Sequence, residues 1–167
     1  MKSNKFVIPA LIGAGIVFLI AKRMNLTSLI ARFEGLELRA YQDQAGVWTI
    51  GYGSTFNPFT NRKVQQGDTI TKEDALRWLE EHIKFFRGNV VRLLKVPQSQ
   101  NQISALTSLA YNIGIGAFQR STLLRLLNSG APAAQVADQF LRWNRIKGEI
   151  SRGLTNRRQL EKDLYLS

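Results

Sequence analysis

The chain contains no cysteine and only one histidine, His82. The lack of cysteine excludes disulfide scaffolds, thiol nucleophiles, zinc ribbons and iron–sulfur sites, and a single imidazole does not make a metal-binding cluster. The sequence therefore predicts no metal site and no cofactor. Any catalysis must depend on carboxylates, hydroxyls or bases other than imidazole.

Acidic residues are scarce, with 12 Asp and Glu against 23 Lys and Arg, which gives a formal net charge of +11 at pH 7. Such a charge predicts an anionic partner: nucleic acid, an anionic membrane surface or a cell-wall polymer. The basic residues are spread along the chain and do not form the compact stripe with interleaved aromatics that is typical of nucleic-acid binders. We therefore expect a cell-wall or membrane partner and no nucleic acid.

Long apolar runs are also lacking, except for residues 6–21 (FVIPALIGAGIVFLIA), which are flanked by Lys2, Lys5, Lys22 and Arg23. As a helix this run would extend roughly 24 Å, against about 30 Å for the hydrocarbon core of a bilayer. Three interpretations are open: a cleaved signal peptide, a permanent anchor, and an uncleaved anchor weak enough to leave the bilayer. No small-x-small cleavage pattern follows the run, which argues against the first. We predict an apolar helical segment here.

After residue 24 the pattern becomes that of one mainly helical domain. Residues 40–70 are rich in glycine, threonine and aromatics, and they contain the one convincing strand region, around Val47 to Tyr52. The expected fold class is α+β, with one small antiparallel sheet in the N-terminal third. Helices are predicted over about 26–36, from Thr71 with an interruption or kink at Gly88, over 99–111, 121–127 and 132–142, and over 156–165.

Most carboxylates have an ordinary structural explanation as helix caps or surface pairs, and Glu161 is expected to pair with Arg157 and Arg158 at a helix N-terminus. Glu34 ends an amphipathic helix directly after an aromatic residue, where partial desolvation suits a general acid. Nine residues later Asp43 lies in a polar loop. Two carboxylates in contrasting environments are the arrangement that glycosidic bond cleavage requires.

The spacing Glu34-x8-Asp43-x5-Thr49, within RFEGLELRAYQDQAGVWTIGYGST, resembles the catalytic signature of the phage-type lysozymes, the endolysins of glycoside hydrolase family 24. The resemblance continues through QISALTSLAYNIGIGAFQRSTLLRLLN (102–128) and GLTNRRQLEKDL (153–164). It covers about residues 26–164 and implies a lysozyme-like fold.

This resemblance also implies roles for the three residues of the signature. Glu34 would be the proton donor, Asp43 the second carboxylate that activates or orients water, and Thr49 its hydrogen-bonding helper. The substrate would be peptidoglycan, cut at the β-1,4 bond between N-acetylmuramic acid and N-acetylglucosamine, to cause host-cell lysis. Inversion is expected, with carboxyl groups roughly 6.5–9.5 Å apart.

The N-terminal segment, residues 1–24, resembles the signal-anchor-release segment of a subset of these endolysins. This implies export by the host Sec machinery, an inactive form held on the periplasmic face of the inner membrane through residues 6–21, and release into the periplasm. Some relatives use a cysteine in this segment as a switch, which this chain cannot do. The catalytic domain would be residues 25–167, acting as a monomer.

Four further residues are candidates for substrate binding. Trp48 and Tyr52 either stack on sugar rings or pack the small sheet, while Asn112 and Gly114 either end a helix or line the cleft. Two other functions stay open: a lytic transglycosylase, which needs an acid but no water-activating carboxylate, and a cationic membrane-active protein without enzymatic activity. Asp43 and Thr49 at the family spacing favour hydrolysis.

Overall fold

The computed structural model describes residues 25–43 and 45–167. The predicted apolar segment 6–21 lies outside these residues, and no helix within them is long and apolar enough to cross a membrane. The predicted α+β class is confirmed, since the described chain is mostly helical with small antiparallel sheets. The elements are α2 (Leu26–Glu34), β1 (Glu37–Gln42), β2 (Trp48–Gly51), α3 (Lys72–Leu93), α4 (Gln100–Ile113), α5 (Ile115–Gln119), α6 (Thr122–Asn128), α7 (Ala133–Asp138), the 3-10 helix η1 (Phe140–Trp143), β3 (Arg145–Ile146), β4 (Glu149–Ile150) and α8 (Arg152–Leu166).

Helix α2 is short and carries the sheet at its C-terminal end. The side chain of Asn25 caps it by accepting a hydrogen bond from the Ser28 backbone, and Gly35, at φ 74°, ends it. The end therefore comes two residues earlier than predicted. Strands β1 and β2 follow and pair in antiparallel register, with Tyr41 opposite Thr49.

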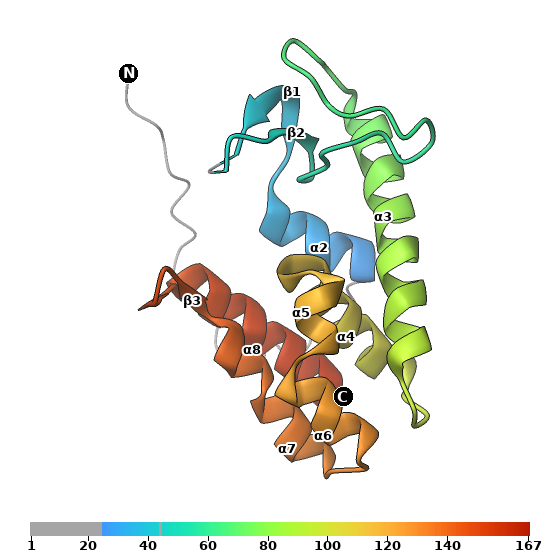
Figure 1. Ribbon diagram of the computed structural model, residues 1–167, viewed down its shortest axis with the longest axis vertical. Coiled ribbons are helices and arrows are strands. Elements are labelled where there is room, and N and C mark those ends of the chain that lie inside the picture. Colours follow the sequence, from blue (N-terminus) through green and yellow to red (C-terminus); the bar gives the residue numbers. More distant parts are fainter. Residues whose placement is uncertain (1–24, 44) are drawn as a thin grey trace.

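Helix α3 runs along one side of the molecule, from the level of the sheet down to the remaining helices (Figure 1). The Thr71 hydroxyl caps its N-terminus by accepting from the Asp74 backbone. The predicted interruption at Gly88 is wrong, since the helix continues without a break to Leu93. An uninterrupted α3 thus forms a continuous wall beside the sheet and the helical part of the molecule.

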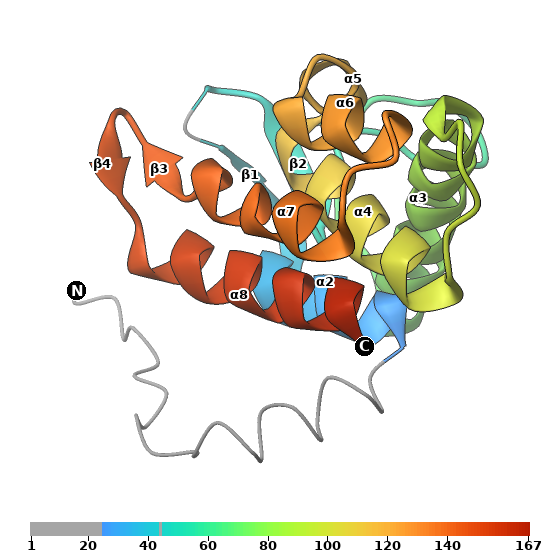
Figure 2. The same ribbon diagram turned by 90° about the horizontal axis from the view of Figure 1, so that it is seen from below.

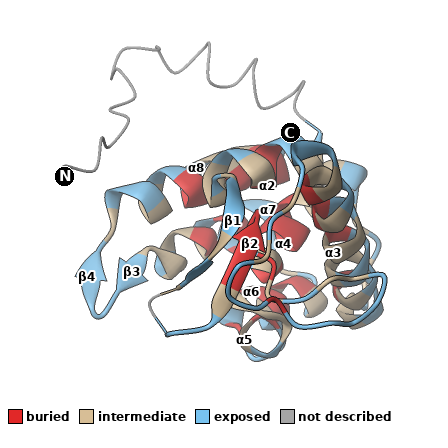
Figure 3. Cartoon of the chain, turned by 90° about the horizontal axis from the view of Figure 1, so that it is seen from above, coloured by how far each residue is buried: buried red, intermediate tan, exposed pale blue. Residues whose placement is uncertain are grey.

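The main hydrophobic core surrounds α4, in which every residue from Ala105 to Ala110 is buried. Helices α6, α7 and α8 lie around it (Figure 2), and the buried positions concentrate on α4 and β2 (Figure 3). A smaller cluster, which contains Ile30, Tyr52 and Leu79, joins α2 to α3 and to the end of β2. The sheet is therefore attached to the helices through α2 and α3.

The C-terminal part departs most from the prediction. Ser151 caps α8, so the helix begins at Arg152, and Arg157 and Arg158 lie in its second turn and not at its N-terminus. The predicted helix over 132–142 is divided into α7 and η1, and an unpredicted hairpin, β3–β4, follows. Arg157, Arg158 and Glu161 lie in the protein interior, where Ser108 of α4 contacts Arg157 and Glu161.

Candidate active site

Glu34 is the last residue of α2, and its carboxylate faces the C-terminal helix. Its Oε1 atom accepts a hydrogen bond from Nη1 of Arg157 at 2.6 Å. The Glu34 side chain is 21% exposed and that of Arg157 only 3%, so the ion pair lies at the boundary between the interior and solvent. The Phe33 ring packs on the guanidinium, 5.2 Å from its carbon atom. These contacts fix the orientation of the Glu34 carboxylate.

Arg157 belongs to a buried charge cluster that also contains Glu161 and Arg158. Glu161 is fully buried, and its Oε1 atom accepts from the Ser108 hydroxyl at 2.6 Å, from Arg157 Nε at 3.2 Å and from Arg158 at 3.0 Å. Burial raises the pKa of the Glu161 carboxyl, and the two guanidiniums oppose that shift. Burial also lowers the pKa of Arg158 to about 10, so Arg158 stays charged at neutral pH. The predicted pairing of Glu161 with Arg157 and Arg158 is confirmed, but the predicted position at a helix N-terminus is wrong, because the pair lies inside α8 and is buried.

Asp43 and Thr49 are brought together through the backbone of Val47. Oδ1 of Asp43 accepts from the backbone N–H of Ala45 at 2.8 Å and of Val47 at 2.9 Å. The Thr49 hydroxyl donates to the Val47 carbonyl at 3.0 Å, and its side chain is 4% exposed. The tight turn after β1 thus orients the second carboxylate and places the threonine beside it on β2.

Tyr41 was not predicted as a site residue, but it lies next to the catalytic candidates. It is the cross-strand partner of Thr49, so both side chains lie on the same face of the β1–β2 pair. Partial burial raises the pKa of its phenol, and the carboxylates of Glu37, Asp43 and Glu34 raise it further. The phenol is therefore within the electrostatic field of both candidate catalytic carboxylates.

A cavity of about 640 Å³ lies beside Glu34, between α3 and the loop after β2. Gly53 lies between the cavity and Glu34, because it lines the cavity and a Cβ atom at this position would be 3.9 Å from Oε2 of Glu34. Tyr111 on α4 closes the inner side, donating from its hydroxyl to the Tyr52 carbonyl at 3.2 Å. Burial, together with the nearby Glu34 carboxylate, raises the pKa of Tyr111. The aromatic lining consists of Phe56, Phe85, Phe86, Tyr111 and His82.

The residues proposed for substrate binding have different surroundings. Tyr52 is 7% exposed and packs with Ile30 and Leu79. Of the two interpretations of this residue, the structure therefore favours packing inside the protein over stacking on a sugar. Gly114, at φ 84°, ends α4 as the turn alternative requires, and Asn112 beside it is exposed. Trp48 is half-buried at the start of β2. Only Trp48 therefore presents a large ring that solvent partly reaches.

Comparison with known proteins gives the family. The family model described as phage lysozyme matches residues 31–161, which is most of the chain and includes Glu34, Asp43 and Thr49. The chain belongs to the phage lysozyme family. It is accordingly a glycoside hydrolase of the lysozyme type, an endolysin that degrades peptidoglycan.

Individual relatives of this phage lysozyme are consistent with that assignment. It is similar to an endolysin of Acyrthosiphon pisum secondary endosymbiont phage 1, with 44% identity over 143 residues covering 83% of this chain and 93% of the relative. It is also similar to a SAR-endolysin of Enterobacteria phage P21, with 31% identity over 159 residues covering 95% and 93%.

Two solved structures confirm the predicted lysozyme-like fold. An endolysin from Escherichia coli O157:H7 phage FAHEc1 has a TM-score of 0.75 and 40% identity, and the match covers 87% of this chain and 95% of that one. The muramidase domain of SpmX from Asticaccaulis excentricus has a TM-score of 0.76 and 36% identity, covering 85% and 95%.

Four residues at the site of this phage lysozyme are not predicted from the sequence: Arg157, Tyr41, Tyr111 and Gly53. The spacing of Arg157 to Glu161 predicts only a bridge between these two residues at a helix N-terminus, and gives no sign of the contact with Glu34. His82 is also absent from the predicted site residues. Its ring lies against Phe56 in the cavity wall, and its Nδ1 atom shares a hydrogen bond with the Ser54 hydroxyl at 3.3 Å. Burial lowers the pKa of His82. Only Tyr41 had a local signal, since it lies two residues before Asp43 in a strand with period two.

Proposed function

We propose that this endolysin hydrolyses the β-1,4 bond between N-acetylmuramic acid and N-acetylglucosamine, with Glu34 as proton donor. The observation that carries the proposal is the pairing of Glu34 with buried Arg157 at the edge of a cavity. When Glu34 transfers its proton to the leaving oxygen, it becomes a carboxylate. Arg157 is already in place to stabilise that carboxylate, so the charge that develops during bond cleavage meets a fixed guanidinium.

The second carboxylate would act on water. Two backbone N–H groups hold Oδ1 of Asp43, and Oδ2, which has no hydrogen bond among the described residues, would accept a proton from a water molecule. Thr49, tied to the same backbone segment, would orient that water with its hydroxyl oxygen. This division of roles gives inversion and requires carboxyl groups roughly 6.5–9.5 Å apart.

The glycan would extend from Glu34 into the aromatic cavity. Its exposed and half-buried rings suit the apolar faces of sugars, and Gly53 leaves room for a sugar beside Oε2 of Glu34. Trp48 is proposed to contact the sugar near Asp43, and Asn112 and Gly114 to contribute polar groups on the α4 side. The buried Tyr52 ring is not proposed to stack on a sugar, and the Tyr52 carbonyl instead holds Tyr111 by accepting a hydrogen bond from its hydroxyl.

The products of digestion test the reaction type. We expect purified peptidoglycan to yield fragments that end in reducing N-acetylmuramic acid, because Asp43 supplies a base for water. Mass spectrometry of the digest distinguishes these fragments from 1,6-anhydromuramic products, which are lighter by one water. Anhydro products as the main species would replace the hydrolase with a lytic transglycosylase, the second candidate.

We infer that residues 1–24 act as a signal-anchor-release segment. The similarity to the SAR-endolysin of phage P21 covers 159 residues, more than residues 25–167 contain, and so extends into this segment. In this proposal the host Sec machinery exports the chain, residues 6–21 hold it at the inner membrane, and release frees it into the periplasm. Only ten residues lie between Arg23 and Glu34, so a bilayer at Lys22 and Arg23 would lie close to the catalytic candidate.

A chain that lacks residues 2–24 tests this control. The described partner of Glu34, Arg157, is on α8, so we expect the shortened chain to cleave purified peptidoglycan at close to the rate of the released full-length chain. The full-length chain in phospholipid vesicles should be at least tenfold less active. Equal activity of the vesicle-bound and shortened chains would contradict inhibition by the membrane, and an inactive but folded shortened chain would mean that the segment completes the site.

A further inference from the structure

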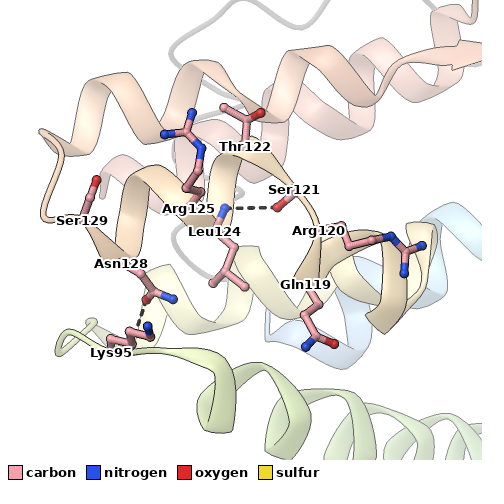
Figure 4. A pocket seen from close by; sticks show the side chains of 9 residues that line it. All are labelled: Lys95, Gln119, Arg120, Ser121, Thr122, Leu124, Arg125, Asn128 and Ser129. Carbon is pink, nitrogen blue, oxygen red and sulfur yellow. Dashed lines mark hydrogen bonds between the residues drawn. The ribbon is translucent and has the colours of Figure 1, made fainter.

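A second cavity, of about 480 Å³, lies outside the site described above, between the end of α3 and helices α5 and α6. Its walls are held in place by Asn128, whose amide donates to the Leu93 carbonyl at 2.9 Å and accepts from the Lys95 backbone at 2.9 Å. The Ser121 hydroxyl caps α6 at the same edge. The lining residues are Lys95, Gln119, Arg120, Ser121, Thr122, Leu124, Arg125, Asn128 and Ser129 (Figure 4).

The lining of this cavity has three cationic side chains and no carboxylate. Lys95, Arg120 and Arg125 form no salt bridge among the described residues, in contrast to Lys84, Arg157 and Arg158. The chain sequence gives a reason, because no Asp or Glu occurs between Glu81 and Asp138. Helices α4, α5, α6 and most of α7 therefore contain no acidic residue, and the positive potential of the cavity is not locally compensated.

The directions of the three cations indicate the kind of anion that fits. In Figure 4 their charged ends lie at separate places around the cavity and do not converge on one point. The Arg120 guanidinium lies over α5, where a Cβ atom at Gly116 would be 3.5 Å from it. Separate cations beside the hydroxyls of Thr122 and Ser129 suit an extended chain with spaced anionic groups, better than a single small ion.

We propose that this cavity binds the acidic stem peptides of peptidoglycan, through their carboxylates, as a second attachment site remote from Glu34. The inference rests on the proposed function, since the same polymer is the substrate. A concave surface with amide and hydroxyl groups favours a peptide over an anionic bilayer, because interfacial membrane binding buries apolar side chains in the bilayer. Binding here would keep the enzyme on the polymer between cleavage events.

The test is binding of the full-length chain to purified, insoluble peptidoglycan, measured by sedimentation in an E34Q background that prevents digestion. We expect R120A/R125A to weaken binding roughly tenfold at 0.1 M salt. The matched control is K63A/K72A, which removes the same charge from exposed side chains far from the cavity in sequence. The control should change binding less than threefold.

Three further measurements identify the ligand. On glycan strands stripped of peptides by an amidase, the E34Q and E34Q/R120A/R125A chains should bind equally. Equal losses for the two double variants on intact peptidoglycan would overturn the proposal in favour of net charge alone. Losses confined to phosphatidylglycerol vesicles would assign the cavity to the membrane and also overturn it. Cleavage of peptide-free strands by R120A/R125A should match that by the parent chain, whereas failure of the parent to release reducing N-acetylmuramic acid ends from intact peptidoglycan would contradict the proposed function separately.

Discussion

Glu34→Gln is expected to reduce hydrolysis of purified peptidoglycan roughly a thousandfold while the fold is retained. The glutamine amide cannot transfer a proton to the leaving oxygen, so the substitution removes the general acid. Its amide oxygen can still accept from Nη1 of Arg157, and Arg157 keeps its bond to Glu161, so the local contacts survive. Turbidity loss of purified peptidoglycan measures the activity, and circular dichroism measures the fold.

The matched control for this substitution is Glu37→Gln. Glu37 is an exposed carboxylate on β1, three residues further along, and it takes part in no salt bridge among the described residues. The Glu37→Gln substitution removes the same charge from the same region, and the variant should keep an activity within twofold of that of the parent chain. If Glu34→Gln retained the parent activity, Glu34 would not be the acid, and a membrane-active protein without enzymatic function would become the better explanation of lysis.

The sequence was sufficient to predict the segments with strong periodicity and clear caps. The start of α3 at Thr71 and the end of α2 near Gly35 follow from local chemistry, because a capping hydroxyl and a glycine act within one turn. The hairpin β3–β4 was missed because each strand has two residues, too few for an alternating pattern. Short, exposed strands of this kind depend on their neighbours for their formation.

For the candidate active site, Glu34, Asp43 and Thr49 could be proposed together from the sequence because they lie within one continuous stretch, and their catalytic roles stay predictions. The partner of Glu34 could not be found in this way, because Arg157 lies 123 residues further on. The four-residue spacing between Arg157 and Glu161 occurs on exposed and on buried helix faces, so it does not tell which of the two applies. Only the packing of α8 against α4 decides between these possibilities, and that packing involves contacts across the whole domain.

The buried cluster itself leads to the largest expected effect on stability. Glu161→Gln removes the fully buried carboxylate that pairs with Arg157 and Arg158. Arg157 keeps Glu34 as a partner, but the Arg158 guanidinium is left in the interior with no carboxylate partner among the described residues. Uncompensated buried charge typically costs about 3–5 kcal/mol. For a domain of this size we expect thermal unfolding roughly 10–15 °C lower. Differential scanning calorimetry at pH 7 measures the change.

Asp163→Asn, on the same helix, is the control for this loss. Its carboxylate accepts from Gln159 at 2.8 Å on the exposed side, and its removal should cost less than about 0.5 kcal/mol. A double variant, Glu161→Gln with Arg158→Gln, should recover part of the stability, because it removes the unpaired Arg158 guanidinium together with the carboxylate. Equal unfolding temperatures for Glu161→Gln and Asp163→Asn would mean that solvent reaches the cluster, and that Arg157 orients Glu34 without a buried counter-charge behind it.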